Sequence, residues 1–342
     1  MFDFGRQNLQ ERLNLSEACA LVGQIASEAV SRASGPAAQI TSHMCSSMGK
    51  GVRSRLLLIC ASDSGLSVPS KAVYAAAAIE IFHLATLVHD DIIDEAATRR
   101  GIESVQSKFG KKNAVITGDY LLCASLYIAS KALEENGLRN ESSKAFVLFN
   151  KYMDCFLKIC LGEMDEMANS QNIRLTPRRY LKIISGKTAE LFRISALIGA
   201  VLAQDDAGLS QVGLIGWNLG MIFQIIDDCM DYGLNGENAK KPIKHDLTQG
   251  VVTLPMILAI AKEPDLARVV KDVFSQRGES DGLTETIRKA GGVDMAVSVA
   301  ERYAQKAEKL TDSLFDGLKR EITREMIQNA LSASSSFETS GG

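Results

Sequence analysis

Two short acidic segments inside otherwise apolar stretches constrain this chain more than any other feature. Both read D-D-x-x-D, and they begin at Asp90 and at Asp227. In a helix, residues four apart lie on one face, so Asp90 stacks over Asp94 and Asp227 over Asp231. Asp is a poor residue for a helix interior, and two like charges ~4 Å apart repel by ~4 kcal/mol near a protein edge. Each segment therefore indicates a bound cation that offsets its charge.

The chemistry of the acidic segments favours one kind of ion. Carboxylates without neighbouring Cys or His suit hard cations, and Mg²⁺ in particular binds through one or two carboxylates plus substrate phosphates. Two such clusters facing each other would hold a polyphosphate ligand. A pair of solvated acidic patches is the alternative, and Asp205-Asp206 is an internal example, because no acid follows one turn later. Two complete copies in apolar helix favour the metal interpretation.

The composition predicts a helical protein with a large core. Of the 342 residues, 46% are apolar and only six are proline. We expect an all-α fold, a single large helical bundle over residues 1–331, followed by a disordered tail at 332–342 that is rich in Ser and Gly. No strand-like alternation is long enough to predict a sheet.

Charge and cysteine content narrow the class of partners and the compartment. The formal net charge of −3 gives no reason to expect nucleic acid, so phosphate binding must be local. Seven cysteines without a C-x-x-C pair predict reduced thiols in a cytoplasmic protein. Residues 1–7 do not resemble a signal peptide. The apolar stretch from Ala72 to Val88 is interrupted by Glu80 and His83, which predicts a buried helix and no membrane span.

Several basic residues lie where they are able to bind anions. Lys50 and Arg53 are three apart at a predicted helix start, where free N–H groups also attract anions, although this pattern alone is common. His83 shares a helix face with the first acidic segment, where a core role and a ligand contact are about equally expected. Arg99 and Arg100 follow that segment and suit bidentate phosphate contacts.

Further signals come from the second half of the chain. Lys187 and Thr188 lie in an apolar helix, so the lysine needs an anionic partner. The loop 235–250 contains Lys241 and directly follows the second acidic segment, which makes it a candidate lid, although polar loops are normally just solvated. The acids of Gly162–Glu166 alternate with apolar residues and are interpreted as structural.

Proline positions mark helix starts. Thr176-Pro177 combines an N-cap residue with a proline at the first-turn position that proline favours. Val68-Pro69 predicts another helix start by the same argument. From there the apolar pattern runs without a breaker to Asp94, so we expect one long helix that ends in the first acidic segment.

In order along the chain, these motifs resemble those of the trans-polyprenyl diphosphate synthases. They lie between Gly49 and Pro255 and read G-K-x-x-R, H-x6-D-D-x-x-D-x4-R-R-G, G-D-Y, G-K-T-A, F-Q-I-I-D-D-x-x-D and D-L-x-x-G-x-x-T-L-P. The resemblance implies the isoprenoid synthase fold, an all-α bundle around a deep central cavity that is usually dimeric. It also implies a prenyltransferase that condenses isopentenyl diphosphate head-to-tail with an allylic diphosphate.

The resemblance assigns roles to individual residues. It implies that Asp90 and Asp94 ligate two Mg²⁺ ions and Asp227 a third, with Asp91, Asp228 and Asp231 completing or supporting the shell. The allylic diphosphate would contact Arg99, Lys187 and Lys241. Isopentenyl diphosphate would contact Lys50, Arg53, His83 and Arg100. Thr188 and Gln224 would line the reacting centre. Val251 stands where many members have a lysine, for which Lys240 or Lys244 would substitute.

Product length depends on the residues below Asp90. Short-chain relatives carry an aromatic residue four or five positions before the first Asp, where this chain has Thr86 and Ala85. Phe82, one turn of about 5.4 Å further down, is the nearest bulky side chain. This predicts a product longer than geranylgeranyl, as in the catalytic subunit of bacterial heptaprenyl diphosphate synthase. A second aromatic from another helix, such as Tyr120 or Tyr127, would shorten it.

Three other interpretations compete with this one. A short-chain farnesyl or geranylgeranyl diphosphate synthase would share every motif. A class I terpene cyclase would share the metal chemistry, but such enzymes seldom carry both acidic copies with the early Lys/Arg pair. A homodimer is expected, and a subunit that depends on a partner in a hetero-oligomer is the remaining alternative.

Overall fold

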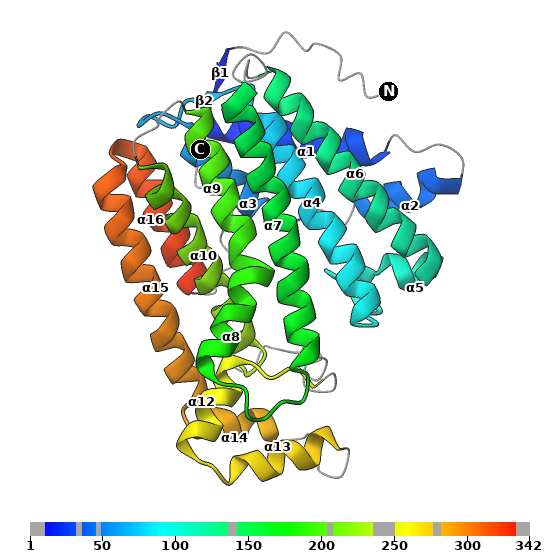
Figure 1. Cartoon of the computed structure of the whole chain (residues 1–342), viewed down its shortest axis with the longest axis vertical. Coiled ribbons are helices and arrows are strands. Elements are labelled where there is room, and N and C mark those ends of the chain that lie inside the picture. Colours follow the sequence, from blue (N-terminus) through cyan, green and yellow to red (C-terminus); the bar gives the residue numbers. More distant parts are fainter. Residues whose placement is uncertain are drawn as a thin grey trace.

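The computed structural model describes residues 11–31, 36–45, 49–135, 142–203, 208–234, 250–275 and 282–332. The candidate lid with Lys241, the Asp205-Asp206 pair and the predicted tail from residue 333 lie outside these ranges. Within them the protein is built from helices and two short strand pairs, which confirms the all-α prediction. The long helices α4, α6, α7, α9 and α10 form the body of the bundle, α15 and α16 flank it on one side, and α12, α13 and α14 lie at one end (Figure 1).

The helices of the first half carry the first acidic segment. Their bounds are α1 Leu15–Ser31, α2 Pro36–Cys45, α3 Val52–Ala61, α4 Ala72–Ile93, α5 Val105–Phe109, α6 Lys111–Glu135 and α7 Ser142–Ala168. Two antiparallel strand pairs join these helices, β1 Arg12–Leu13 with β2 Val68–Pro69, and β3 Thr98–Arg99 with β4 Ile102–Glu103. The first acidic segment is the C-terminal end of α4.

The helices of the second half carry the second acidic segment at the end of α10. Their bounds are α8 Pro177–Ile184, the π-helix η2 Ser185–Ala189, α9 Glu190–Leu202, α10 Leu209–Met230, α12 Leu254–Lys262, α13 Leu266–Phe274, α14 Leu283–Lys289, α15 Gly292–Leu314 and α16 Gly317–Leu331. The N-cap prediction at Thr176 is confirmed, because its side chain accepts a hydrogen bond from the Arg179 backbone N–H at 3.3 Å.

Close backbone contacts hold the helices that position the site. A Cβ atom at Gly199 of α9 would lie 2.3 Å from the Leu57 carbonyl oxygen of α3. One at Gly216 of α10 would lie 2.4 Å from the Phe192 carbonyl oxygen of α9. Real Cβ atoms do not approach so closely, so glycine is required where α9 meets both neighbours. Helix α9 is thereby fixed between α3 and α10.

Helices α4 and α10 are apolar because they form the core. Both are long and apolar enough to pass a test for membrane spans by length and composition. However, 67% of the apolar window of α4 and 61% of that of α10 are buried inside the protein. This burial agrees with the prediction of a buried helix from Ala72 to Val88.

One predicted helix start is wrong. Val68-Pro69 forms strand β2, with Pro69 opposite Arg12 and Val68 opposite Leu13, and α4 begins only at Ala72. The neighbouring Ser70 backbone N–H donates to the Glu11 carbonyl oxygen at 3.1 Å. Proline tolerates an edge strand as well as a helix start, and pairing with the distant residues 11–13 selects the strand.

Candidate active site

The acidic segments lie at the C-terminal ends of two long helices. Asp94 and Asp231 are the C-cap residues of α4 and α10, and neither helix has a basic residue in its last turn. The negative end of the helix dipole disfavours further negative charge there. Burial and then the neighbouring charge of Glu163 raise the pKa of Asp90 to about 7, against the opposing effect of Lys187. Negative charge at this end of α4 is therefore unfavourable unless an additional cation offsets it.

The second aspartate of each segment points into the protein. Asp91 is 3% exposed and accepts from Arg99 Nε at 2.8 Å, and Arg99 Nη2 lies 2.6 Å from the same oxygen. Asp228 is 7% exposed and accepts from the Tyr180 hydroxyl at 2.5 Å and from Gln224 Nε2 at 2.7 Å. Successive residues are turned by about 100° around a helix, so these side chains leave the face shared by the first and third aspartates. The buried Asp91 and Asp228 are therefore suited to support the aspartates that face outward.

Lys187 has the anionic partner that the sequence required. Its ammonium lies 3.0 Å from Glu163 Oε2 and forms a second ion pair with Glu166, both on α7. Burial alone would lower the pKa of Lys187, but Glu166 and Glu163 outweigh it and hold the pKa above its ordinary value. Lys187 is therefore a permanently charged ammonium inside the site.

The two glutamates that bind Lys187 also interact electrostatically with both acidic segments. After burial, the charge of Glu163 is the largest cause that raises the pKa of Asp90. The charge of Asp94 in turn helps to raise the pKa of Glu163. Burial, with smaller contributions from the charges of Asp227 and Glu166, raises the pKa of Asp228 to about 8. Because Lys187 binds both glutamates, the ends of α4 and α10 share one electrostatic environment.

A basic wall lies beside the acidic ends. Arg53 of α3 donates from Nη1 to His83 Nε2 of α4 at 3.1 Å, which leaves this imidazole nitrogen as the acceptor. Burial, followed by the charges of Arg53, Arg100 and Arg99, lowers the pKa of His83 well below its usual range. The Arg100 guanidinium lies against Gly49, where a Cβ atom would be 2.5 Å from it. Three predicted phosphate contacts thus converge, while Lys50 is exposed nearby in sequence.

Arg53 is the most deeply buried member of the basic wall. Its guanidinium lies over the Phe192 ring at 4.5 Å from the centroid, and its Nε has no hydrogen-bond partner among the described residues. Burial lowers the pKa of Arg53 to about 10, and the charge of Asp227 is among those that oppose this shift. A buried cation with an unused donor is suited to receive an anion.

Comparison with known proteins identifies the family of this chain. The family model for polyprenyl synthetase matches residues 36–290. The chain belongs to the polyprenyl synthetase family. It is 32% identical over 281 residues to heptaprenyl diphosphate synthase component 2 of Bacillus subtilis, covering 81% of this chain and 77% of the relative. It is 34% identical over 271 residues to geranylgeranyl diphosphate synthase of Sulfolobus acidocaldarius, covering 78% of this chain and 80% of that protein.

A solved structure supports the same assignment. The polyprenyl synthase from Caulobacter crescentus complexed with calcium and isoprenyl diphosphate superposes with a TM-score of 0.81 and 27% identity, covering 93% of this chain and 95% of that one. The chain therefore has the isoprenoid synthase fold and is a prenyltransferase of the polyprenyl synthetase family.

The donor groups of this polyprenyl synthetase fit a hard divalent cation. The outward-facing groups at the two helix ends are carboxylates, which supply the oxygen ligands that Mg²⁺ prefers. Within the described ranges, no three Asp, Glu, His or Cys side chains already surround a common point. An ion bound by Asp90, Asp94, Asp227 or Asp231 would therefore complete its shell with diphosphate oxygens and water, as Mg²⁺ commonly does.

A short hydrogen-bond chain links the residues expected at the reacting centre. The Thr188 hydroxyl donates to Gln224 Oε1 at 2.6 Å, and the amide nitrogen of Gln224 donates to Asp228. The position of Gln224 one turn before Asp228 on α10 makes the second bond, and η2 presents Thr188 to α10. Both residues that the sequence placed at the reacting centre thus lie beside the second acidic segment.

An aromatic layer crosses the interior below Asp90. Phe82 of α4 stacks on Phe156 of α7 with ring centroids 3.9 Å apart, and Tyr152 packs edge-on against Phe156 at 4.7 Å. The Tyr152 hydroxyl is held by Ser125 Oγ at 2.7 Å. Ala85, one turn closer to the acids, is buried without adding bulk.

A small apolar cavity of about 30 Å³ lies on the other side of this aromatic layer. It is lined by side chains of α4, α6, α7 and α9: Ala75, Ala78, Ala129, Ala132, Leu148, Phe149, Tyr152, Ile198 and Leu202. Tyr152 is the residue that belongs to both the layer and the cavity. The layer thus separates this cavity from the part of the interior nearer the acids.

The aromatics that the sequence proposed from another helix have other partners. The Tyr120 hydroxyl donates to the Ala29 carbonyl oxygen of α1 at 3.1 Å, and the Tyr127 ring lies 5.9 Å from the Lys131 ammonium. The second aromatic in the layer is Phe156 of α7. Sequence analysis missed Phe156 because the inward face of α7 depends on packing between distant helices.

Sequence analysis also missed the partners of the predicted site residues. Glu163 and Glu166 were interpreted as structural, although their three-residue spacing puts them on one helix face opposite Lys187. No motif in the sequence points to Tyr180 as a partner of the site. Glu80 accepts a hydrogen bond from the Ser54 backbone N–H at 3.0 Å. Its negative charge is the largest effect that opposes the lowering of the Arg53 pKa by burial.

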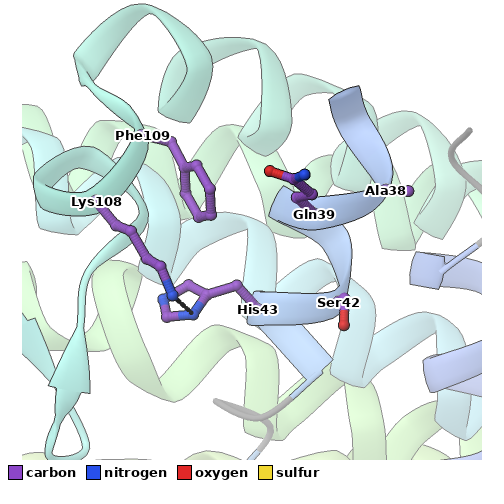
Figure 2. Close-up of a pocket in the computed structure, with 6 residues that line it drawn as sticks. All are labelled: Ala38, Gln39, Ser42, His43, Lys108 and Phe109. Carbon is purple, nitrogen blue, oxygen red and sulfur yellow. Dashed lines mark hydrogen bonds between the residues drawn. The ribbon is translucent and has the colours of Figure 1, made fainter. Parts of the chain in front are cut away.

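A surface hollow of about 520 Å³ between α2 and α5 lies apart from these residues (Figure 2). Its lining contains none of the predicted site residues. Lys108 Nζ donates to His43 Nδ1 at 3.2 Å, and the remaining His43 N–H donates to the Glu103 carbonyl oxygen at 2.8 Å. These contacts tie α2 to the segment that leads from β4 into α5.

Replacing Tyr180 with Phe removes one of the two side-chain donors to the buried Asp228 carboxylate. An unpaired buried acceptor costs about 1–3 kcal/mol, so we expect the free energy of unfolding to fall by about that amount. Denaturant unfolding followed by circular dichroism measures it. Tyr303→Phe, in which the ring retains its contact with Trp217, is the control. Equal stability of Tyr180→Phe and wild type would show that this hydrogen bond does not support Asp228.

Proposed function

We propose that this protein is a Mg²⁺-dependent prenyltransferase that condenses isopentenyl diphosphate head-to-tail (1′-4) with an allylic diphosphate to give a trans-polyprenyl diphosphate. The observation that carries the proposal is that two sets of charged groups lie within electrostatic range of the aspartates. Lys187, ion-paired with Glu163 and Glu166, interacts with the charge of Asp90, and Arg53 of the basic wall interacts with that of Asp227. A cyclase that binds one diphosphate has no need of this second, basic wall.

The side chains of the site form two subsites, one for each diphosphate. The allylic diphosphate lies between the acidic ends and accepts hydrogen bonds from Lys187, with Arg99 and Lys241 as further contacts. Isopentenyl diphosphate lies against the basic wall and accepts from Lys50, Arg53 and Arg100. Bound Mg²⁺, with three ions implied by the family resemblance, supplies electrostatic stabilisation of the charge that develops on the departing diphosphate.

The reaction is balanced without a side-chain base. The allylic C–O bond breaks with its electron pair on the diphosphate, and the double bond of isopentenyl diphosphate attacks the resulting carbocation to form the new C–C bond. The proton lost from the isopentenyl unit passes to the released diphosphate. The apolar interior below Asp90, lined by Ala85 and Phe82, excludes water that would otherwise quench the cation.

The purified chain should convert farnesyl and isopentenyl diphosphates to a longer prenyl diphosphate when Mg²⁺ is present, and excess chelator should abolish the reaction. Asp90→Asn and Asp227→Asn should each lower kcat by about a hundredfold or more, because each removes a carboxylate that would hold the Mg²⁺ needed to stabilise the departing diphosphate. Product formation is measured with radiolabelled isopentenyl diphosphate. Asp63→Asn, at an exposed surface ion pair with Arg12, is the control. Full turnover in chelator would refute the metal-dependent mechanism.

We further propose a product longer than geranylgeranyl. The small side chains of Ala85 and Thr86 leave the path open where short-chain relatives are blocked, and an apolar cavity continues the interior beyond Phe82. The stacked Phe82–Phe156 layer favours a second candidate, a short-chain synthase whose product ends at the layer. The rise along α4 from Asp90 to Phe82 is about 12 Å, so a longer chain would have to displace one of these rings.

Ala85→Phe should shorten the product, because it puts a ring one turn closer to Asp90. Phe82→Ala should lengthen the product of a short-chain synthase, because it opens the layer toward the cavity below. Mass spectrometry of the dephosphorylated products measures both changes. Ala85→Ser, which adds little volume at the same position, is the control. If Ala85→Phe and wild type make products of the same length, the growing chain does not follow α4.

We propose that the chain is a cytoplasmic homodimer formed through α6 and α7. Among the described residues, several large apolar side chains are exposed on these two helices: Val115, Ile116, Phe146, Val147, Leu157, Leu161, Met164 and Met167. Leu157, Leu161 and Met164 share one face of α7 because of their spacing. Contiguous exposed apolar surface of this kind marks an interface. A hetero-oligomer is the alternative, since component 2 in the name of the Bacillus subtilis relative denotes one of several parts.

Leu157→Glu combined with Leu161→Glu should convert a dimer to a monomer, because it buries charge at the centre of the apolar face. Size-exclusion chromatography with light scattering measures the mass. Leu318→Glu, an equally apolar exposed position on α16, is the control. A wild-type chain that is monomeric and gains activity only with a second subunit would support the hetero-oligomer.

A further inference from the structure

Lys187 is held by an unusual local backbone. It lies in the π-helix η2, and α7 packs directly against this element. A Cβ atom at Gly162 would lie 2.4 Å from the Lys187 backbone nitrogen, and one at Gly186 would lie 2.9 Å from the Lys158 carbonyl oxygen. Two glycines therefore bring the α7 backbone against η2, and the Lys187 side chain leaves this contact toward the α7 residues that follow Gly162.

Two glutamates of α7 receive that side chain. Glu163 and Glu166 lie on one face of the helix and bind the same ammonium, and all three side chains are at most one quarter exposed. One ammonium does not neutralise two carboxylates, and the pair lies beside Asp90 and Asp94 at one end and Asp228 at the other. Buried ion pairs contribute little net stability, so an additional acid next to these aspartates has no structural advantage.

We propose that Glu163 and Glu166 are positioning residues that hold the Lys187 ammonium where it meets the diphosphate of the allylic substrate. This inference rests on the proposed function and deepens it, because it assigns two residues that act through Lys187 on one of the two substrates.

The physical reason is the flexibility of lysine. A lysine side chain has four rotatable bonds and loses substantial rotamer freedom when it is fixed. Two carboxylates on one rigid helix face determine the ammonium position before substrate arrives, so less of that freedom is lost on binding. Glu163 interacts electrostatically with Asp90 and Asp94, and Glu166 with Asp228, so the two glutamates lie close to both acidic segments.

The test is a double-mutant cycle on the Mg²⁺-loaded enzyme. Glu166→Gln should raise KM for the allylic diphosphate by about tenfold and leave KM for isopentenyl diphosphate unchanged, because a charged hydrogen bond to Lys187 is lost. Lys187→Gln should show the same selectivity. In the Lys187→Gln background, Glu163→Gln and Glu166→Gln should have no further effect on KM. Glu166→Asp, which keeps the charge, should recover part of the affinity.

Asp165→Asn is the matched control, since Asp165 lies on the same helix turn but pairs with Arg179 at 2.7 Å. It should behave as wild type for both substrates, and an effect equal to that of Glu166→Gln would overturn the positioning role. Additive effects of Glu166→Gln and Lys187→Gln, or equal rises in KM for both substrates, would also overturn it. Failure of the proposed function is distinguishable, because the wild-type enzyme would then make no prenyl product at all.

Discussion

Negative charge at the C-terminal ends of two apolar helices is the constraint on which the rest of this structure depends. Helices α4 and α10 supply the core, and each ends in carboxylates at the pole of the helix dipole that disfavours them. The surrounding structure offsets part of this charge with specific partners. Arg99 binds Asp91, and Tyr180 and Gln224 bind Asp228.

The packing of the core places these partners where the charge requires them. Gly199 and Gly216 fix α9 against α3 and α10, and η2 at the start of α9 carries Lys187 and Thr188. Helix α3 contributes Arg53, whose guanidinium lies over Phe192 of α9. Arg53, Lys187 and the second acidic segment are therefore attached to helices that are fixed against one another. This arrangement explains why a site assembled from distant parts of the chain has a fixed geometry.

The sequence predicted what depends on local periodicity. The cap at Thr176 and the end of α4 follow from helix geometry, and the motif order identified the family. The sequence predicts that Lys187 has an anionic partner. It does not predict that Glu163 and Glu166 are the partners, because this depends on the register between α7 and η2. The π-helix was not predictable, since one altered backbone hydrogen-bond register leaves no compositional signal. The helix start predicted at Val68-Pro69 is wrong for a related reason, because a strand partner distant in sequence outweighs the local preference for a helix.

The position of the aspartates on the helix dipole also makes folding and metabolism interdependent. Without counter-ions, the ends of α4 and α10 repel charge and lower the stability of the native state. Any molecule that binds there and not to the unfolded chain adds to stability by mass action, according to its concentration relative to its dissociation constant. If the diphosphates of the proposed reaction bind there, resistance of this protein to heat and proteolysis would rise with their concentration.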